Sequence, residues 1–239
     1  MDGKRFDCVI FDWDLTLVRV MGDVSPEERL TALFQNAGLP YTLREVQHSV
    51  RQFQEDVRAG RARRHGLQQT EQEIGQYYRD ILLRLNHGAN ERVEIGHLYD
   101  AFAQLPYLPY RETFPVLQAL RDRGLKLGVV SNHSRLIRPV MEQLLHEFIA
   151  PEWMFISQEM RAHKPAAQIY RHVCAQMDAT PESSIFVGDH LQVDAAGAVE
   201  VGGFALGLWL DRKGEGGETA VLPPNVYRIT SLSQVLQYI

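Results

Sequence analysis

The sequence has little cysteine and no long apolar run. Its 239 residues include two cysteines, Cys8 and Cys174, each inside an apolar stretch. This pattern predicts buried thiols in a reducing compartment and argues against a disulfide framework or a cysteine metal site. No apolar run approaches the length that spans a membrane. The N-terminus carries early charges and no long apolar stretch, which argues against a signal peptide, so we expect a cytoplasmic location without membrane partners.

An excess of positive charge is also missing, as are internal repeats and low-complexity segments. The formal net charge is −5, which implies no general affinity for nucleic acid. The chain is 45% hydrophobic and 23% charged, as is typical of a soluble globular protein. Its length is sufficient for one large or two small domains.

The most informative stretch lies near the start of the chain, at residues 6–16. The apolar run Cys8 to Phe11 predicts a fully buried strand, and it is followed by Asp12, Asp14 and Thr16. Alternate residues of an extended chain point to opposite sides. The two aspartates can therefore share one ligand only if the chain bends or if one of them uses its backbone carbonyl. Carboxylates at the end of a buried strand suit a hard cation, although a capped strand end with a surface turn is the alternative.

Helix signals dominate the next eighty or so residues. Ser25 to Glu28 and Thr42 to Glu45 are capping boxes, and Thr70 opens a third helix. Asn90 is a candidate cap for a fourth helix. Apolar residues recur at helical spacing in each segment, and no convincing strand lies between residues 20 and 105. This block is predicted to be an all-helical unit of about four helices.

After Pro106 and Pro109 the chain alternates between helices and apolar strands. Strands are expected at 125–130, 154–157, 184–187 and 204–208, with an edge strand at 227–229. Alternation of this kind predicts an α/β fold with a parallel sheet. The helical block is inserted after the first strand, so we expect a core made of residues 1–17 and 108–239 and a helical domain made of residues 18–107.

Polar motifs follow four of the expected strands. They are Asp12 to Asp14, Ser131-Asn132, Lys164, and Gly188-Asp189. The carboxyl ends of parallel strands share one sheet edge, where ligands bind, so these residues are expected to meet in one cleft. Three carboxylates, a lysine and a small hydroxyl suit a divalent cation together with an anionic group such as phosphate. One carboxylate could attack phosphorus while a second transfers protons and the cations neutralise charge.

Taken in order, these motifs resemble those of the haloacid dehalogenase-like (HAD) hydrolase superfamily. The resemblance covers the whole predicted core, and Asp194 fits it as well. It implies a Rossmann-like α/β core with an inserted all-α cap domain of the first cap class, in a phosphoglycolate phosphatase-like member. It further implies a Mg²⁺-dependent phosphatase that cleaves a small-molecule phosphate ester through an aspartyl-phosphate.

The resemblance assigns roles to particular residues. Asp12 would be the nucleophile and a metal ligand, and Lys164 would pair with it. Asp14 would be the general acid and base and would bind the metal through its backbone carbonyl. Asp189 would be the third protein ligand of the metal.

The remaining roles concern phosphate binding and orientation. Thr16 would fix the loop by hydrogen bonding, and Ser131 and the amide of Asn132 would bind phosphoryl oxygens. Asp194 would orient Lys164 or a metal-bound water. An acid on the first turn of a helix is the plainer alternative for Asp194.

The chain departs from the family pattern at two positions. Leu15 stands where the family usually has glycine, and leucine restricts the turn. His190 follows Asp189 where a small residue is commoner. Arg58, Arg61, Arg63, Arg64 and His65 form a basic cluster in the helical block. It is interpreted as a solvated face, with contact between one arginine and an anionic substrate as the alternative.

Three other functions compete with the phosphatase. A 2-haloacid dehalogenase would use the same fold and nucleophile to attack carbon without a metal, but it would have no use for Asp14 and Asp189. A phosphomutase would need the Asp12 phosphate to survive until the substrate returns. A non-catalytic binding protein would be expected to lack a catalytic acid or the lysine, and none is missing. The substrate stays open between phosphoglycolate, a sugar phosphate and a nucleoside monophosphate, and the assembly between monomer and homodimer.

Overall fold

The chain forms two compact units in the computed structural model, which describes residues 6–21, 24–64, 70–85, 95–214 and 221–239. The α/β unit comprises Met1–Arg19, Pro109–Asn132 and Val140–Ile239. The helical unit comprises Val20–Leu108 and His133–Pro139. Placing the domain boundaries after residues 17 and 107 stays a prediction. The assignment of 133–139 to the helical unit was not expected from the sequence.

A six-stranded parallel sheet forms the centre of the α/β unit, with the order β5-β4-β1-β6-β7-β8. The parallel α/β architecture expected from the sequence is therefore confirmed. Its strands are β1 (Cys8–Phe11), β4 (Lys126–Ser131), β5 (Met154–Ile156), β6 (Ser184–Gly188), β7 (Leu206–Leu210) and β8 (Val226–Ile229).

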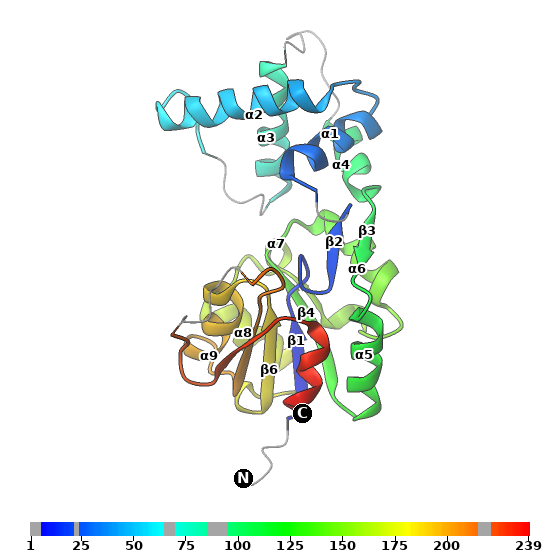
Figure 1. Cartoon of the computed structure of the whole chain (residues 1–239), viewed down its shortest axis with the longest axis vertical. Coiled ribbons are helices and arrows are strands. Elements are labelled where there is room, and N and C mark those ends of the chain that lie inside the picture. The colour runs from blue at the N-terminus through cyan, green and yellow to red at the C-terminus, as the bar shows by residue number, and fades with distance from the viewer. Residues whose placement is uncertain (1–5, 22–23, 65–69, 86–94, 215–220) are drawn as a thin grey trace. The chain divides into compact units, whose positions relative to one another are not determined.

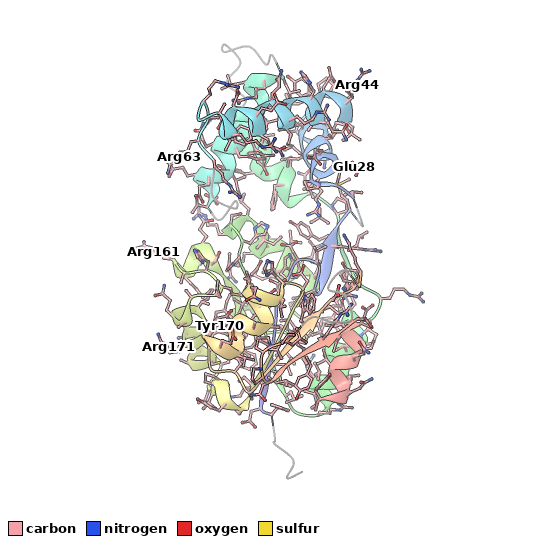
Figure 2. All side chains as sticks on the ribbon, turned by 60° about the vertical axis from the view of Figure 1, so that its left-hand side comes forward. Glu28, Arg44, Arg63, Arg161, Tyr170 and Arg171 are labelled. Carbon is pink, nitrogen blue, oxygen red and sulfur yellow. The ribbon has the colours of Figure 1, made fainter. Side chains whose placement is uncertain are left out.

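Helices cover the sheet because its strands are apolar on both faces. Cys8 and Ile10 of β1 share a buried cluster with α8, and Figure 1 shows α8 and α9 on one side of the strands and α5 on the other. Tyr170 of α8 is buried in this cluster, whereas Arg171 points outward (Figure 2). The helices that begin in or lie within this unit are α5 (Thr113–Asp122), α7 (Ser157–Met160), α8 (Ala167–Gln176), α9 (Ala196–Glu200), and the short turns η2 (Pro151–Trp153), η3 (Pro181–Ser183), η4 (Leu191–Ala195) and η5 (Leu232–Gln237). Both cysteines are buried free thiols, as predicted.

The helical unit is built from helices whose first residues can be predicted from the local sequence. Its elements are α1 (Pro26–Asn36), α2 (Leu43–Arg58), α3 (Glu71–Arg84), α4 (Ile95–Ala103) and the 3₁₀ turn η1 (Arg135–Ile137), which leads into α6 (Arg138–Leu145). Ser25 and Thr42 form the expected capping boxes, and the hydroxyl of Thr70 accepts a bond from the amide of Glu73. These three helix starts are confirmed. The expected cap at Asn90 lies outside the described residues.

Several details differ from the sequence prediction. Two short strands that were not predicted, β2 (Val18–Val20) and β3 (Tyr107–Pro109), pair in a separate two-stranded sheet. The strand expected at 204–208 begins at Leu206, because the amide of Phe204 bonds to the carbonyl of Ala198 within the preceding helix α9. Among the described residues, no helix has both the length and the apolar character needed to cross a membrane.

Candidate active site

The carboxylate of Asp12 lies at the end of β1 and is held by a buried lysine. Lys164 Nζ donates to Asp12 Oδ1 over 2.6 Å and to Asp194 Oδ1 over 2.7 Å. The Lys164 side chain is 1% exposed, and Asp12 and Asp194 are buried as well. Buried charges are stabilised only when they are paired and hydrogen-bonded, and this one ammonium satisfies two carboxylates. This arrangement fixes the position of the Asp12 carboxylate relative to Lys164.

The loop after β1 supplies the second contact to Asp12. Thr16 Oγ1 donates to Asp12 Oδ2 over 3.2 Å, so both oxygens of the carboxylate are hydrogen-bonded. The loop closes on itself through the amide of Leu15, which donates to the carbonyl of Val18 over 2.7 Å. Leu15 has a φ of 59°, in the left-handed region that favours glycine. The leucine noted as a departure in the sequence therefore sits at a position of backbone strain.

The end of β4, which pairs with β1, and the loop that follows β5 and α7 position the phosphate-binding candidates and Lys164. Ser131 ends β4 and is 2% exposed. The side chain of Asn132 accepts a bond from the Lys164 amide over 2.8 Å and donates to the Lys164 carbonyl over 2.9 Å. The side-chain amide group of Asn132 thus fixes the backbone from which the lysine projects. The peptide bond between Lys164 and Pro165 is cis.

The end of β6 brings two further carboxylates to the same place. Asp189 follows Gly188, and Asp194 lies in the π-helical turn η4. Asp194 Oδ2 accepts from the amide of His190 over 3.0 Å. A Cβ atom on Gly188 would lie 2.4 Å from the Cβ of Asp194, so glycine is required for this close approach. π-Helical turns are frequent at functional sites, and this one turns Asp194 toward Lys164.

The charges of these groups perturb one another. Burial raises the pKa of Asp189 to about 7, with further contributions from Asp194 and Asp14. Burial by itself would lower the pKa of Lys164, but the carboxylates of Asp12 and Asp194 outweigh it and raise that pKa above its usual value. The lysine is therefore a permanent cation, and Asp189 is poised to ionise near neutral pH.

The same carboxylates fit a divalent cation. One oxygen each from Asp12, Asp189 and Asp194 lies within 4.8 Å of the others. With Lys164, these three carboxylates leave a formal charge of −2 in a largely buried place. Hard cations such as Mg²⁺ take oxygen ligands, and a dication would neutralise this charge. The donor set of the α/β unit could therefore hold a metal ion.

The structure brings together most of the residues singled out in the sequence. Asp12, Thr16, Asn132, Lys164 and Asp194 are joined by the hydrogen bonds described above, and Asp189 belongs to the carboxylate cluster. Asp14 is half-buried, and its charge acts on Asp189, but its carboxylate is not in the cluster. This agrees with a role in which the Asp14 carboxylate stays available for proton transfer. The roles themselves stay predictions.

Sequence reasoning missed three side chains that support the site. Trp209 Nε1 donates to the carbonyl of Asp189 over 3.0 Å, and the hydroxyl of Tyr170 donates to the carbonyl of Val193 over 2.6 Å. Arg212 Nε and Nη2 donate to the carbonyls of Leu15 and Thr16. All four bonds reach backbone oxygens far away in the sequence. No spacing rule identifies such pairs, although Trp209 and Arg212 lie where a parallel strand ends.

Several side chains that neighbour the site residues in the sequence, and those of the basic cluster, have ordinary surroundings. Trp13 is a buried core ring, and His163 and His190 are exposed. In the basic cluster, Arg58, Arg61, Arg63 and Arg64 are exposed, and Arg61 pairs with Asp56 at 2.8 Å (Arg63 is labelled in Figure 2). His65 lies outside the described residues. A solvated face is therefore the interpretation that the exposure of these arginines favours.

Comparison with known proteins gives a family match over most of the chain. The family model described as haloacid dehalogenase-like hydrolase matches residues 6–202. A glyceraldehyde 3-phosphate phosphatase of Methanopyrus kandleri is 32% identical over 100 residues, which are 39% of this chain and 40% of that protein. The chain thus aligns with less than half the length of that curated relative.

Solved structures match over the whole length but at low identity. The putative HAD-hydrolase YfnB of Bacillus subtilis, whose structure is bound to magnesium, has a TM-score of 0.66 at 16% identity, with 98% of each chain covered. A 2-haloacid dehalogenase of Pseudomonas syringae pv. Tomato has a TM-score of 0.63 at 20% identity, covering 98% of this chain and 97% of that one. At these identities the likeness concerns the fold.

Proposed function

Because the chain belongs to the haloacid dehalogenase-like hydrolase family, we propose that it is a Mg²⁺-dependent phosphatase acting through an aspartyl-phosphate on Asp12. The observation that carries this proposal is the cluster of the buried Asp12 and Asp194, both bonded to Lys164, with the half-buried Asp189. Such an excess of negative charge is costly to bury without a cation. A dehalogenase that attacks carbon without a metal would gain nothing from it.

In the first half of the proposed reaction, a carboxylate oxygen of Asp12 attacks phosphorus. A bond forms between this oxygen and phosphorus, and the bond from phosphorus to the ester oxygen breaks. The carboxyl group of Asp14 donates its proton to the departing oxygen, so that an alcohol leaves. Lys164 and Thr16 hold Asp12 in one orientation throughout, which lowers the entropic cost of the attack.

In the second half, the carboxylate of Asp14 takes a proton from water. The water oxygen bonds to phosphorus, the bond between phosphorus and Asp12 breaks, and inorganic phosphate leaves. Asp14 then carries the proton that it needs for the next cycle. This double role suits a carboxylate that lies outside the three-carboxylate cluster.

Charge on the phosphoryl oxygens must be stabilised in both halves. Lys164 provides one positive charge. The hydroxyl of Ser131 and the backbone amide of Asn132 are the proposed hydrogen-bond donors. Mg²⁺, held by Asp12, Asp189 and the Asp14 carbonyl, would supply the remaining charge neutralisation. Asp194 accepts a second hydrogen bond from Lys164 and helps to keep it in place.

The substrate is proposed to be a small phosphomonoester, in line with the phosphatases among the curated relatives. The helical unit would serve as a cap that excludes water from the reaction. A location in the cytoplasm is proposed as well, because both cysteines are buried thiols, which suits a reducing compartment.

Phosphate release from a panel of esters tests the function. The panel includes glyceraldehyde 3-phosphate, phosphoglycolate, a sugar phosphate and a nucleoside monophosphate, each with Mg²⁺ and with EDTA. We expect release that needs Mg²⁺ and that Asp12→Asn lowers by at least about 10³-fold. Asp7→Asn makes the same chemical change at the other, exposed end of β1 and should leave the rate unchanged.

Three results would contradict the proposal. Release of halide from 2-chloropropionate in EDTA, lost in Asp12→Asn, would identify a dehalogenase. Release of phosphate that is unchanged in Asp12→Asn would exclude this residue as the nucleophile. Transfer of phosphate from a labelled ester to a second substrate position without release would identify a phosphomutase.

A further inference from the structure

The loop between Asp12 and Thr16 is strained and needs to be held from outside. Leu15 has a φ of 59°, a conformation that costs a residue with a Cβ atom free energy and that glycine adopts readily. Internal bonds from the amides of Leu15 and Leu17 close the loop, but they also form in other tight turns. Something beyond the loop must therefore favour this conformation over one with negative φ.

Arg212, just after β7, holds the strained part of this loop by two hydrogen bonds, which together form the Arg212 grip. Its Nε donates to the carbonyl of Leu15 over 3.0 Å, and its Nη2 donates to the carbonyl of Thr16 over 2.8 Å. A guanidinium is planar and presents its donors in a rigid fork, so two neighbouring carbonyls bound together are fixed in their relative direction. Arg212 therefore holds the peptide group that follows Leu15 and the one that follows Thr16.

Arg212 is itself anchored on the chain segment that precedes α5. Its Nη1 pairs with Glu112 Oε1 at 2.5 Å, and its guanidinium carbon lies 3.6 Å from the centre of the Tyr110 ring. The Arg212 side chain is 19% exposed. Stacking on an aromatic face and a charge-assisted bond restrict the guanidinium before it reaches the loop. Two contacts therefore restrain the guanidinium that binds the loop.

We propose that Arg212 is a positioning residue that holds the Asp12–Thr16 loop in its left-handed turn and thereby aims the carboxyl groups of Asp12 and Asp14. This inference rests on the proposed phosphatase. Thr16, whose carbonyl Arg212 binds, donates its hydroxyl proton to Asp12 Oδ2. Asp14 directly precedes Leu15, so rotation at Leu15 would swing its backbone. Arg212 touches neither carboxyl group and acts through Leu15 and Thr16.

Hydrogen exchange tests the grip without any need for activity. The amides of Leu15, Leu17 and Val18 are all hydrogen-bonded, so a peptide covering 12–20 should be protected in the natural protein. In Arg212→Met we expect its exchange to rise by about tenfold or more, while a peptide from β6 stays unchanged. Arg123→Met is the matched control, because Arg123 also donates to a distant carbonyl, that of Leu236, away from the loop.

Kinetics then separate positioning from general stability. Arg212→Met should lower kcat by about 10- to 100-fold with KM changed by less than about threefold, since misaimed groups affect the chemical step. The kcat of Arg212→Lys should lie between those of Arg212→Met and the natural protein, because an ammonium cannot bind two carbonyls as a fork. Adding Leu15→Gly to Arg212→Met should recover part of kcat, because glycine adopts the left-handed turn without help.

The outcomes are distinguishable. Unchanged exchange of the 12–20 peptide in Arg212→Met would overturn the proposal, as would equal losses of kcat in Arg212→Met and Arg123→Met. If Arg212→Met does not fold, Glu112→Gln removes part of the anchor and should raise the same exchange by a smaller factor. If the natural protein hydrolyses no ester, the phosphatase fails, and faster exchange in Arg212→Met alone still supports the grip.

Discussion

The two units of this chain fix their parts by different means. In the helical unit, α1, α2 and α3 each begin with a serine or threonine whose side chain caps the helix. In the α/β unit, α5, α7, α8 and α9 begin, within the described residues, without a side-chain cap bond. Local capping thus marks the starts of α1, α2 and α3, whereas packing on the sheet and contacts between distant residues position α5, α7, α8 and α9.

Charges follow the same division. The ion pair between Asp56 and Arg61 in the helical unit leaves the arginine 65% exposed, whereas Lys164 is 1% exposed between two carboxylates. An exposed pair is largely solvated and contributes little, while a buried group depends on every partner. The buried cluster therefore concentrates both the chemistry and the sensitivity of the fold.

The largest contrast is expected from removing one cation in each unit. Lys164→Met leaves Asp12 and Asp194 buried without their ammonium and should lower the free energy of unfolding by about 3–5 kcal/mol. Arg61→Met should lower it by less than about 1 kcal/mol. Urea denaturation of both variants measures the difference, and equal losses would refute the contrast between buried and exposed charge.

Adding one methyl group should change stability in opposite directions in the two units. In Gly188→Ala the new Cβ would lie 2.4 Å from Asp194, so we expect a loss of about 1–3 kcal/mol and of activity. In Gly96→Ala, on α4, the new Cβ meets no atom within 4 Å, and a helix gains about 0.5–1 kcal/mol from alanine. Thermal and urea unfolding of the two variants measure the direction of each stability change. A Gly188→Ala variant more stable than the natural protein would contradict this prediction.

A change of protonation near neutral pH is expected in the α/β unit. The pKa of Asp189 is raised to about 7 by burial, Asp194 and Asp14, so this group binds its proton more tightly folded than unfolded. Without metal, its contribution to stability is full below its ordinary pKa of 3.8 and is lost as pH rises through about 7. Because Mg²⁺ needs the ionised carboxylate, its affinity should rise by up to about tenfold per pH unit and level off above neutrality. Calorimetric titration with Mg²⁺ at several pH values measures this, and a flat profile would contradict it.

The smallest effects are expected at the helix caps. Thr42→Ala removes the capping box of α2 and should cost about 1 kcal/mol of unfolding free energy. Ala166→Ser offers a cap to α8, which begins without one, and should gain no more than about 0.5 kcal/mol because packing already fixes that helix. Denaturant unfolding compares the two, and a large gain at Ala166 would show that α8 also depends on its cap.

What could be predicted from the sequence follows this division of the molecule. Helix starts at Ser25, Thr42 and Thr70 were predictable because the bonds that make them span three residues. The meeting of Asp12, Lys164 and Asp189 was predictable because parallel topology brings strand ends together. The strands β2 and β3, the π-helical turn at Asp194 and the grip of Arg212 were not. Each depends on a partner that only the folded chain brings near.

The segment 133–139 has a consequence for anyone building chimeras of this protein. It follows Asn132 directly, yet it belongs to the helical unit, where Arg135 forms two hydrogen bonds with Glu71 at 2.6 and 2.9 Å and His133 lies against Phe102. The helical unit is therefore two pieces of chain. A graft that replaces only residues 20–108 would separate Arg135 and His133 from the partners they have here, whereas a transplant of both pieces keeps them together.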